Sequence, residues 1–111
     1  MPCKEVQKQI HELFNSYLGY SIEKMIELMR GAISSAERNE CPPWLGAHAW
    51  MTLGIVQGSG QGDLSRAREA FDRALALDFD VPLDAQLATE GLKQVFEEAR
   101  AAARNRRAPK P

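Results

Sequence analysis

The sequence predicts an all-α protein of about five helices, and three observations support that fold class. Apolar residues recur at spacings of three and four along most of the 111 residues, as on helices with one buried face. Valine occurs only four times, whereas alanine, leucine, glutamate and arginine, which favour helix, are frequent. Proline and glycine cluster at a few points, and these points divide the chain into segments of helix length.

The first two expected helices form the N-terminal third of the chain. The first covers about residues 4–18 and ends before Gly19, and the second follows the good N-cap residue Ser21 and ends near Arg38. Each helix carries an apolar stripe at helical spacing. The stripes consist of Val6, Ile10, Leu13, Phe14 and Tyr17 in the first helix, and Ile22, Met25, Ile26, Met29, Ala32, Ile33 and Ala36 in the second.

Consecutive prolines separate the second helix from the third. Pro42 and Pro43 cannot continue a helix, but either one can open the next helix at its first turn. We therefore expect the third helix over about residues 43–57.

The glycine-rich run at residues 58–62 is expected to be a flexible turn between helices. It shares only its glycines with phosphate-binding loops, since it follows a helix and lacks the Gly-Lys-Ser/Thr ending that holds phosphate and magnesium. We therefore expect no nucleotide here. Asp63 or Ser65 then caps a fourth helix, which ends near Leu77.

The last expected helix covers residues 90–104, with Thr89 as its N-cap. We place one domain at residues 1–104 and a flexible basic tail at 105–111, because the tail contains two prolines and no apolar periodicity. Residues 1–99 hold nine Lys and Arg against all 15 acidic residues, and the remainder adds five positive charges. An acidic body with a short basic end disfavours a broad nucleic-acid surface.

The clearest motif lies in the third and fourth helices. Trp50, Leu53 and Gly54 share one face of the third helix. On the fourth helix Phe71 shares a face with three small residues, Ala67, Ala70 and Ala74. Small residues opposite large ones let two antiparallel helices approach closely. This order of residues resembles the tetratricopeptide repeat (TPR), a helix-turn-helix unit of about 34 residues. The resemblance is specific over residues 47–78 and degenerate over 7–38, where a plain helical hairpin explains the same pattern.

The resemblance implies a fold and a function. The fold would be stacked antiparallel helical hairpins, with the helix at 90–104 as a C-terminal cap whose outer face is polar. TPR proteins usually bind other proteins, which implies a non-enzymatic adaptor, scaffold or chaperone-like module that holds a partner's peptide or helix in a concave groove. In this family the first helix of each pair lines that groove. The groove residues would be Lys8, His11, Glu12 and Asn15 from the first unit, and His48, Met51, Thr52 and Ile55 from the second.

Trp44 leaves two interpretations open. It lies six residues before Trp50 and does not share its packing face, so it is either a lid over the end of the core or a partly exposed anchor for a partner. An alternative function is assembly, for example a homodimer, through exposed apolar surface around Trp44, Met25 and Met29. A nucleic-acid accessory role of the basic tail is a third and less expected function.

The sequence nominates no catalytic or metal site. His11 and His48 are the only histidines, and we expect them to be structural or solvent-exposed. No Cys, His, Asp or Glu residues have the spacing of zinc ligands, and no Ser or Cys lies in a nucleophile motif. We therefore expect no metal, no cofactor and no enzymatic activity.

We expect the protein to be cytoplasmic. No stretch approaches the 18 apolar residues of a membrane span, and the N-terminal residues lack the apolar core of a signal peptide. In the cytoplasm Cys3 and Cys41, which have no CxxC spacing, are expected to be reduced thiols.

Overall fold

The structure, a computed structural model, is helical through most of the chain that it describes. It describes the backbone of residues 2–15, 21–84 and 87–107, and the side chains of residues 3–12 and of the latter two ranges. Within these residues there is no strand, so the predicted all-α class is confirmed. The five α-helices are α1 (Pro2–Asn15), α2 (Ile22–Arg38), α3 (Pro43–Ile55), α4 (Leu64–Leu77) and α5 (Glu90–Arg107).

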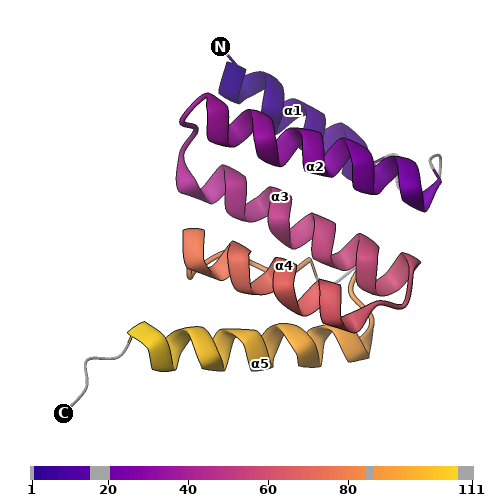
Figure 1. Ribbon diagram of the computed structural model, residues 1–111, viewed down its shortest axis with the longest axis vertical. Helices are drawn as coiled ribbons and strands as arrows, with labels where there is room; N and C mark the ends of the chain where they lie inside the picture. Colours follow the sequence, from indigo (N-terminus) through magenta and orange to yellow (C-terminus); the bar gives the residue numbers. More distant parts are fainter. Residues whose placement is uncertain (1, 16–20, 85–86, 108–111) are drawn as a thin grey trace.

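The first two helices pack side by side and antiparallel at one end of the molecule (Figure 1). α2 begins as expected, because the Ser21 hydroxyl accepts a hydrogen bond from the Lys24 backbone N–H at 3.2 Å. Apolar residues of both helices meet one face of α3 in a cluster that we call the N-terminal core. It consists of Val6, Ile10, Met29, Ala32, Ile33, Ala36, Leu45, Ala49 and Leu53.

α3 begins at Pro43, the second of the two prolines. It does not end in a flexible turn, which corrects the expectation for residues 58–62. Its end instead widens into a π-helical segment, η2 (Val56–Gly60), so most of the glycine-rich run is helical. α4 then starts after Asp63, whose carboxylate accepts a hydrogen bond from the Arg66 backbone N–H at 3.0 Å.

α3 and α4 are antiparallel (Figure 1), and a glycine sets how closely they approach. A Cβ atom at Gly54 would lie 2.6 Å from Cε1 of the fully buried Phe71, so only glycine leaves room for this ring. Phe71 also packs edge-on against Phe96 of α5, with ring centroids 5.3 Å apart. Trp50 lies at the edge of this packing, partly buried, with the Arg73 guanidinium 5.2 Å from its ring centroid.

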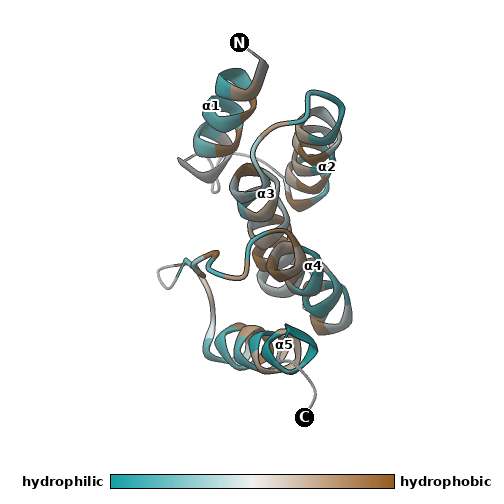
Figure 2. Ribbon diagram, turned by 90° about the vertical axis from the view of Figure 1, so that its left-hand side faces the viewer, coloured by the Kyte–Doolittle hydropathy of each residue, from teal (hydrophilic) through white to brown (hydrophobic). Residues whose placement is uncertain are grey.

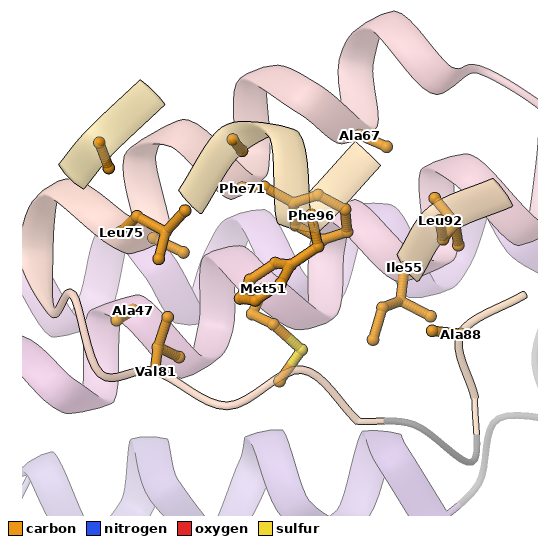
Figure 3. Close-up of a cluster of buried hydrophobic side chains, with 13 residues drawn as sticks. Ala47, Met51, Ile55, Ala67, Phe71, Leu75, Val81, Ala88, Leu92 and Phe96 are labelled. Atoms are coloured by element: carbon orange, nitrogen blue, oxygen red, sulfur yellow. The ribbon is translucent and has the colours of Figure 1, made fainter. Parts of the chain in front are cut away.

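A second cluster, the C-terminal core, lies between α3, α4, α5 and the segment that joins α4 to α5 (Figure 3). The connecting segment contributes Val81 and Ala88 to this core, and the three helices contribute the rest. The core consists of Ala47, Met51, Ile55, Ala67, Phe71, Ala74, Leu75, Val81, Ala88, Leu92, Phe96, Ala99 and Ala103.

α5 runs parallel to α4 rather than antiparallel to it (Figure 1). The connecting segment therefore runs back from the end of α4 to the start of α5, and it lies on the same side of α3 as α1 (Figure 2). Its described parts are residues 78–84 and 87–89. Successive antiparallel packing thus extends from α1 to α4 and stops there, because an extended segment follows α4 where a further repeat would continue with a helix. Thr89 caps α5 as expected, since its hydroxyl accepts a hydrogen bond from the Leu92 N–H at 3.2 Å.

α5 continues to Arg107, so residues 105–107 belong to the helix and not to a flexible tail. The guanidinium groups of Arg107 and Arg100 lie 4.3 and 5.3 Å from the ring centroid of Phe79. These cation–π contacts hold the last turns of α5 against the connecting segment. Residues 108–111 of the expected tail lie outside the described residues.

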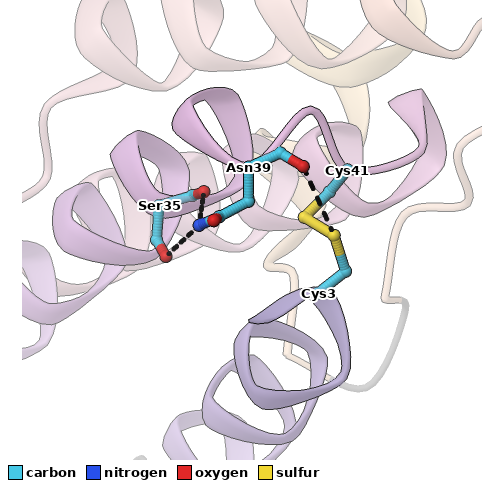
Figure 4. Close-up of a disulfide and its surroundings, with 4 residues drawn as sticks. All are labelled: Cys3, Ser35, Asn39 and Cys41. Atoms are coloured by element: carbon cyan, nitrogen blue, oxygen red, sulfur yellow. Dashed lines mark hydrogen bonds between the residues drawn. A yellow bond between two sulfur atoms is a disulfide. The ribbon is translucent and has the colours of Figure 1, made fainter. Parts of the chain in front are cut away.

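Cys3 and Cys41 form a disulfide, which corrects the expectation of two reduced thiols (Figure 4). Antiparallel packing of α1 on α2 places the start of α1 beside the end of α2, and the two Cα atoms lie 5.5 Å apart. The Asn39 carbonyl oxygen lies 3.9 Å from the Cys3 sulfur, and the Asn39 side-chain amide donates to the Ser35 carbonyl at 2.7 Å. The bond ties the N-terminal helix to the junction between α2 and α3.

Removing the disulfide should destabilise the protein. The bond closes a loop with a sequence separation of 38 residues, so the double variant Cys3→Ser, Cys41→Ser should lose about 2–4 kcal/mol of unfolding free energy. Urea unfolding with and without reductant measures the loss. The wild type should respond to reductant and the double variant should not, and equal stability of both proteins would contradict the structural bond.

Gly54 should tolerate no side chain. Gly54→Ala places a methyl group against the buried Phe71 and 3.3 Å from the Ala67 carbonyl oxygen, so we expect a loss of about 1–3 kcal/mol by thermal or urea unfolding. Gly31→Ala is the matched control, because Gly31 is exposed within α2 and a Cβ there meets nothing within 4 Å. The control should gain about 0.5–1 kcal/mol, as alanine usually does in a helix. A gain at both positions would disprove the close approach of α3 and α4.

Candidate functional site

The groove residues expected from the first unit lie on α1. Lys8, His11 and Glu12 are exposed, so their side chains are accessible to another molecule. The side chain of Asn15 lies outside the described residues.

Three of the four groove residues expected from α3 are buried. Met51, Thr52 and Ile55 are only 2%, 1% and 0% exposed. Met51 and Ile55 lie in the C-terminal core, where the connecting segment covers them with Val81 and Ala88 (Figure 3). These residues therefore do not line an open groove in this structure. The repeat pattern could not show that the chain returns across this face of α3.

His48 is the groove residue of α3 that reaches the surface, and it is partly buried. Burial lowers the pKa of its imidazole below the usual value of 6.5. The Asp84 carboxylate acts in the opposite direction, and His11 adds to the lowering. Since the pKa is lowered, the imidazole is mostly uncharged at neutral pH, with one nitrogen as a donor and the other as an acceptor.

Asp84 belongs to this group, although the sequence did not single it out. Its carboxylate accepts a hydrogen bond from the Leu87 N–H at 3.2 Å, and its carbonyl accepts one from the Ala88 N–H at 3.1 Å. Asp84 thus forms the turn that shapes the connecting segment beside His48. No local signal links Asp84 to His11 or His48, because only the return of the chain along α3 brings the three elements together.

Trp44 lies one helical turn before His48 on the same side of α3. Its side chain is 47% exposed, so Trp44 is a large aromatic residue that reaches the surface. α1 and α3 run in the same direction (Figure 1), and the effect of His11 on the pKa of His48 places His11 of α1 near His48. The residues that we call the α1–α3 face are Lys8, His11, Glu12, Trp44 and His48.

The α1–α3 face carries groups suited to contacts with another molecule. It combines an indole ring, a neutral imidazole and side chains of opposite charge. Among the described residues no three His, Cys, Asp or Glu side chains are placed to hold one metal ion. Both cysteines are in the disulfide and therefore supply no thiolate.

The apolar surface expected to drive self-association is not present as expected. Met25 and Met29 are both 0% exposed, because the amphipathic α2 turns them into the interior. Of the three residues named for such a surface, only Trp44 is exposed.

The chain was compared with protein-family models, with curated proteins and with solved structures, and none of them matches it. The resemblance to TPR proteins therefore rests on the residues between positions 47 and 78 alone.

The pKa of His48 should respond to its two neighbours. An NMR titration should place it below 6.5 in the wild type. His11→Gln should raise it, because a cationic neighbour is removed, and Asp84→Asn should lower it further. If neither variant changes the pKa of His48, then His11 of α1 and Asp84 of the connecting segment do not lie near it.

Stability should also depend on His48 through pH. The folded-state pKa is depressed, so the unfolded chain binds more protons as pH falls through 6.5, and stability decreases in that direction. His48→Gln should flatten the curve of unfolding free energy between about pH 7 and pH 5. Urea unfolding at several pH values measures this, and curves that coincide after normalisation would contradict the burial of a neutral imidazole.

Proposed function

We propose that this chain is a non-enzymatic protein–protein interaction module, a small adaptor or chaperone-like protein, that binds a peptide or helix of a partner on the α1–α3 face. The observation that carries the proposal is the half-exposed Trp44, which lies one helical turn from His48. Large apolar side chains are usually buried, and an exposed tryptophan beside polar groups is typical of residues that dominate binding energy.

The surroundings of Trp44 favour a mixed apolar and polar ligand. Lys8 and Glu12 give opposite charges on α1, and the neutral His48 offers one donor and one acceptor to a partner's backbone or side chain. An amphipathic helix or an extended segment could place one apolar residue on the indole and polar groups along α1. The resemblance to TPR proteins, which usually bind other proteins, points to the same class of function.

The proposed binding surface on α3 is smaller than the groove expected from the sequence. The connecting segment occupies the stripe of Met51 and Ile55, so contacts from α3 would come from its first half. A partner would therefore lie between α1 and the connecting segment, across the start of α3. The earlier alternative of self-assembly retains only Trp44 as its anchor, and a dimer by light scattering that disappears in Trp44→Ala would favour that alternative over a separate partner.

The nucleic-acid alternative has weaker support. Arg100 and Arg107, two of the five positive charges beyond residue 99, pack against Phe79 in the structure. Both contacts fix these side chains against the connecting segment, although Arg107 remains exposed.

The disulfide is relevant to the cellular compartment in which the protein resides. Among the described residues no helix is both long and apolar enough to cross a membrane. A cytoplasmic location, as expected from the sequence, would require the Cys3–Cys41 bond to be reduced there, because cytoplasmic thiols are usually kept reduced. Alkylation of thiols during cell lysis tests this location: two alkylated cysteines would support it, and a blocked pair would favour an oxidising compartment.

Truncating Trp44 should remove partner binding without unfolding the protein. We expect Trp44→Ala to weaken binding of a captured partner by about 2 kcal/mol or more, roughly thirtyfold, because the residue would be the anchor. Its effect on stability should stay within about 1 kcal/mol, because the side chain is half exposed. Pull-down from native cell extract followed by calorimetry with the isolated partner measures both.

Leu64→Ala is the matched control for Trp44→Ala. Leu64 has the same exposed fraction of 47%, and it lies at the start of α4, away from the α1–α3 face. The control should bind as the wild type does. Equal binding by all three proteins, or amide shifts confined to the side of α3 that faces α2 and α4, would contradict the proposed surface.

A further inference from the structure

A hollow of about 250 Å³ lies on the other side of α3, between α2 and α4. α2 and α4 lie on one side of α3, whereas α1 and the connecting segment lie on the other (Figure 2). The hollow is therefore separate from the α1–α3 face. Its lining consists of Arg30 from α2, Trp50 and Leu53 from α3, Gln57 from η2, and Arg66, Glu69, Ala70 and Arg73 from α4.

The lining is positively charged. It holds three arginines and a single acidic residue, Glu69. Arg66 is engaged by the Asp63 carboxylate at 3.3 Å, and Arg73 lies over the Trp50 ring. Arg30 forms no ion pair within the part of the chain that the structure describes. Arg30 and Arg73, on opposite walls, thus have guanidinium donors that no carboxylate of the described chain takes up.

Gln57 adds a neutral hydrogen-bond donor to the charged lining. It is only 3% exposed, and what is exposed lines this hollow. Its backbone carbonyl accepts hydrogen bonds from the N–H groups of Gln61 and Asp63, both at 3.1 Å, which fixes the π-helical turn. Its side-chain amide has no hydrogen bond to any described residue. Arg100 Nε is the fully buried side-chain polar atom that lacks a partner among the described residues, so the Gln57 amide remains reachable from the hollow and can donate to an anion that enters it.

We propose that this hollow is a binding site for a small oxyanion, a phosphate monoester or free phosphate. Guanidinium forks match the geometry of phosphate oxygens, and two of them on opposite walls can bind one group from both sides. The Gln57 amide would donate from the floor, and the Trp50 ring would form an apolar wall. With Arg66 paired, Arg30 and Arg73 still outweigh Glu69, so the lining favours an anion. The volume is below that of sites for whole drug-sized ligands, so it suits a phosphate group rather than a whole cofactor.

The site would result from the π-helical turn and from packing. Arg30, Gln57 and Arg73 belong to three different elements and lie far apart in the sequence. The widened turn η2 carries Gln57 into the space between α2 and α4. The proposal does not depend on the partner-binding proposal, because the two surfaces share no residue.

NMR titration of the full chain tests the proposal, with inorganic phosphate and phosphoserine as probes at constant ionic strength. We expect saturable shifts of the Gln57 side-chain amide and the Trp50 indole. Arg30→Gln should weaken phosphate affinity by about fivefold or more, as expected for a lost charge-assisted hydrogen bond. Glu69→Gln should strengthen it by about twofold or more, because a nearby negative charge is removed.

Two further variants separate ligand binding from structure and from general electrostatics. Arg38→Gln makes the same charge change at an exposed position at the end of α2, outside the hollow, and should leave the affinity unchanged. Gln57→Leu should abolish the saturable shift at Trp50 while the protein keeps its thermal midpoint, because leucine fills the same space without an unpartnered amide.

Three results would overturn the proposal. These are equal phosphate affinity in Arg30→Gln and Arg38→Gln, shifts at Gln57 that do not saturate, and acetate binding as tight as phosphate. Phosphoserine binding more tightly than phosphate would identify a phosphorylated side chain or metabolite as the source of the group. Equal affinity for both would identify the free anion.

Discussion

α3 is buried on two opposite faces, and the other helices are arranged around it. α3 is apolar around most of its circumference, and a helix of this kind has to be covered on every side. Leu45, Ala49 and Leu53 face the N-terminal core, and Ala47 and Met51 face the C-terminal core. α1 and α2 therefore cover one face, while α4, α5 and the connecting segment cover the other.

The two candidate sites follow from what this packing leaves uncovered. Beyond its first turn α3 reaches the surface through two strips, one at His48 and one at Trp50. The first strip adjoins α1 and carries the α1–α3 face, and the second lies between α2 and α4 above the hollow. Each strip positions its polar side chains on a rigid helix, as recognition of a ligand requires. Both proposed activities thus use the helix that contributes to both cores.

The helices were predictable because their signals are local. Ser21 and Thr89 were identified as caps from residue type and position, and both accept the expected backbone hydrogen bond. For α4 the sequence left Asp63 and Ser65 open, and Asp63 is the cap. The small residues of α4 likewise predicted a face that packs closely against a neighbouring helix. The sequence could not show how the chain would connect the last two helices, because the segment from Asp78 to Thr89 has no period that fixes its direction.

The errors about the sites come from contacts between residues distant in sequence. Met51 and Ile55 were expected in a groove, but Val81 and Ala88 return to cover them. Cys3 and Cys41 were expected as thiols from their number and location, but the antiparallel α1 and α2 bring them together. Asp84, Arg30 and Gln57 were not singled out at all. Each acquires its role only through neighbours that folding supplies, and nothing in the adjacent sequence marks that role.

Native-state hydrogen exchange tests the central position of α3 most directly. If both cores depend on this helix, the amides from Leu45 to Ile55 should exchange only through global unfolding, with the free energy measured by denaturant. α1 and α5 each cover one side and should open at lower free energy. Exchange of α3 amides before those of α1 or α5 would contradict the account.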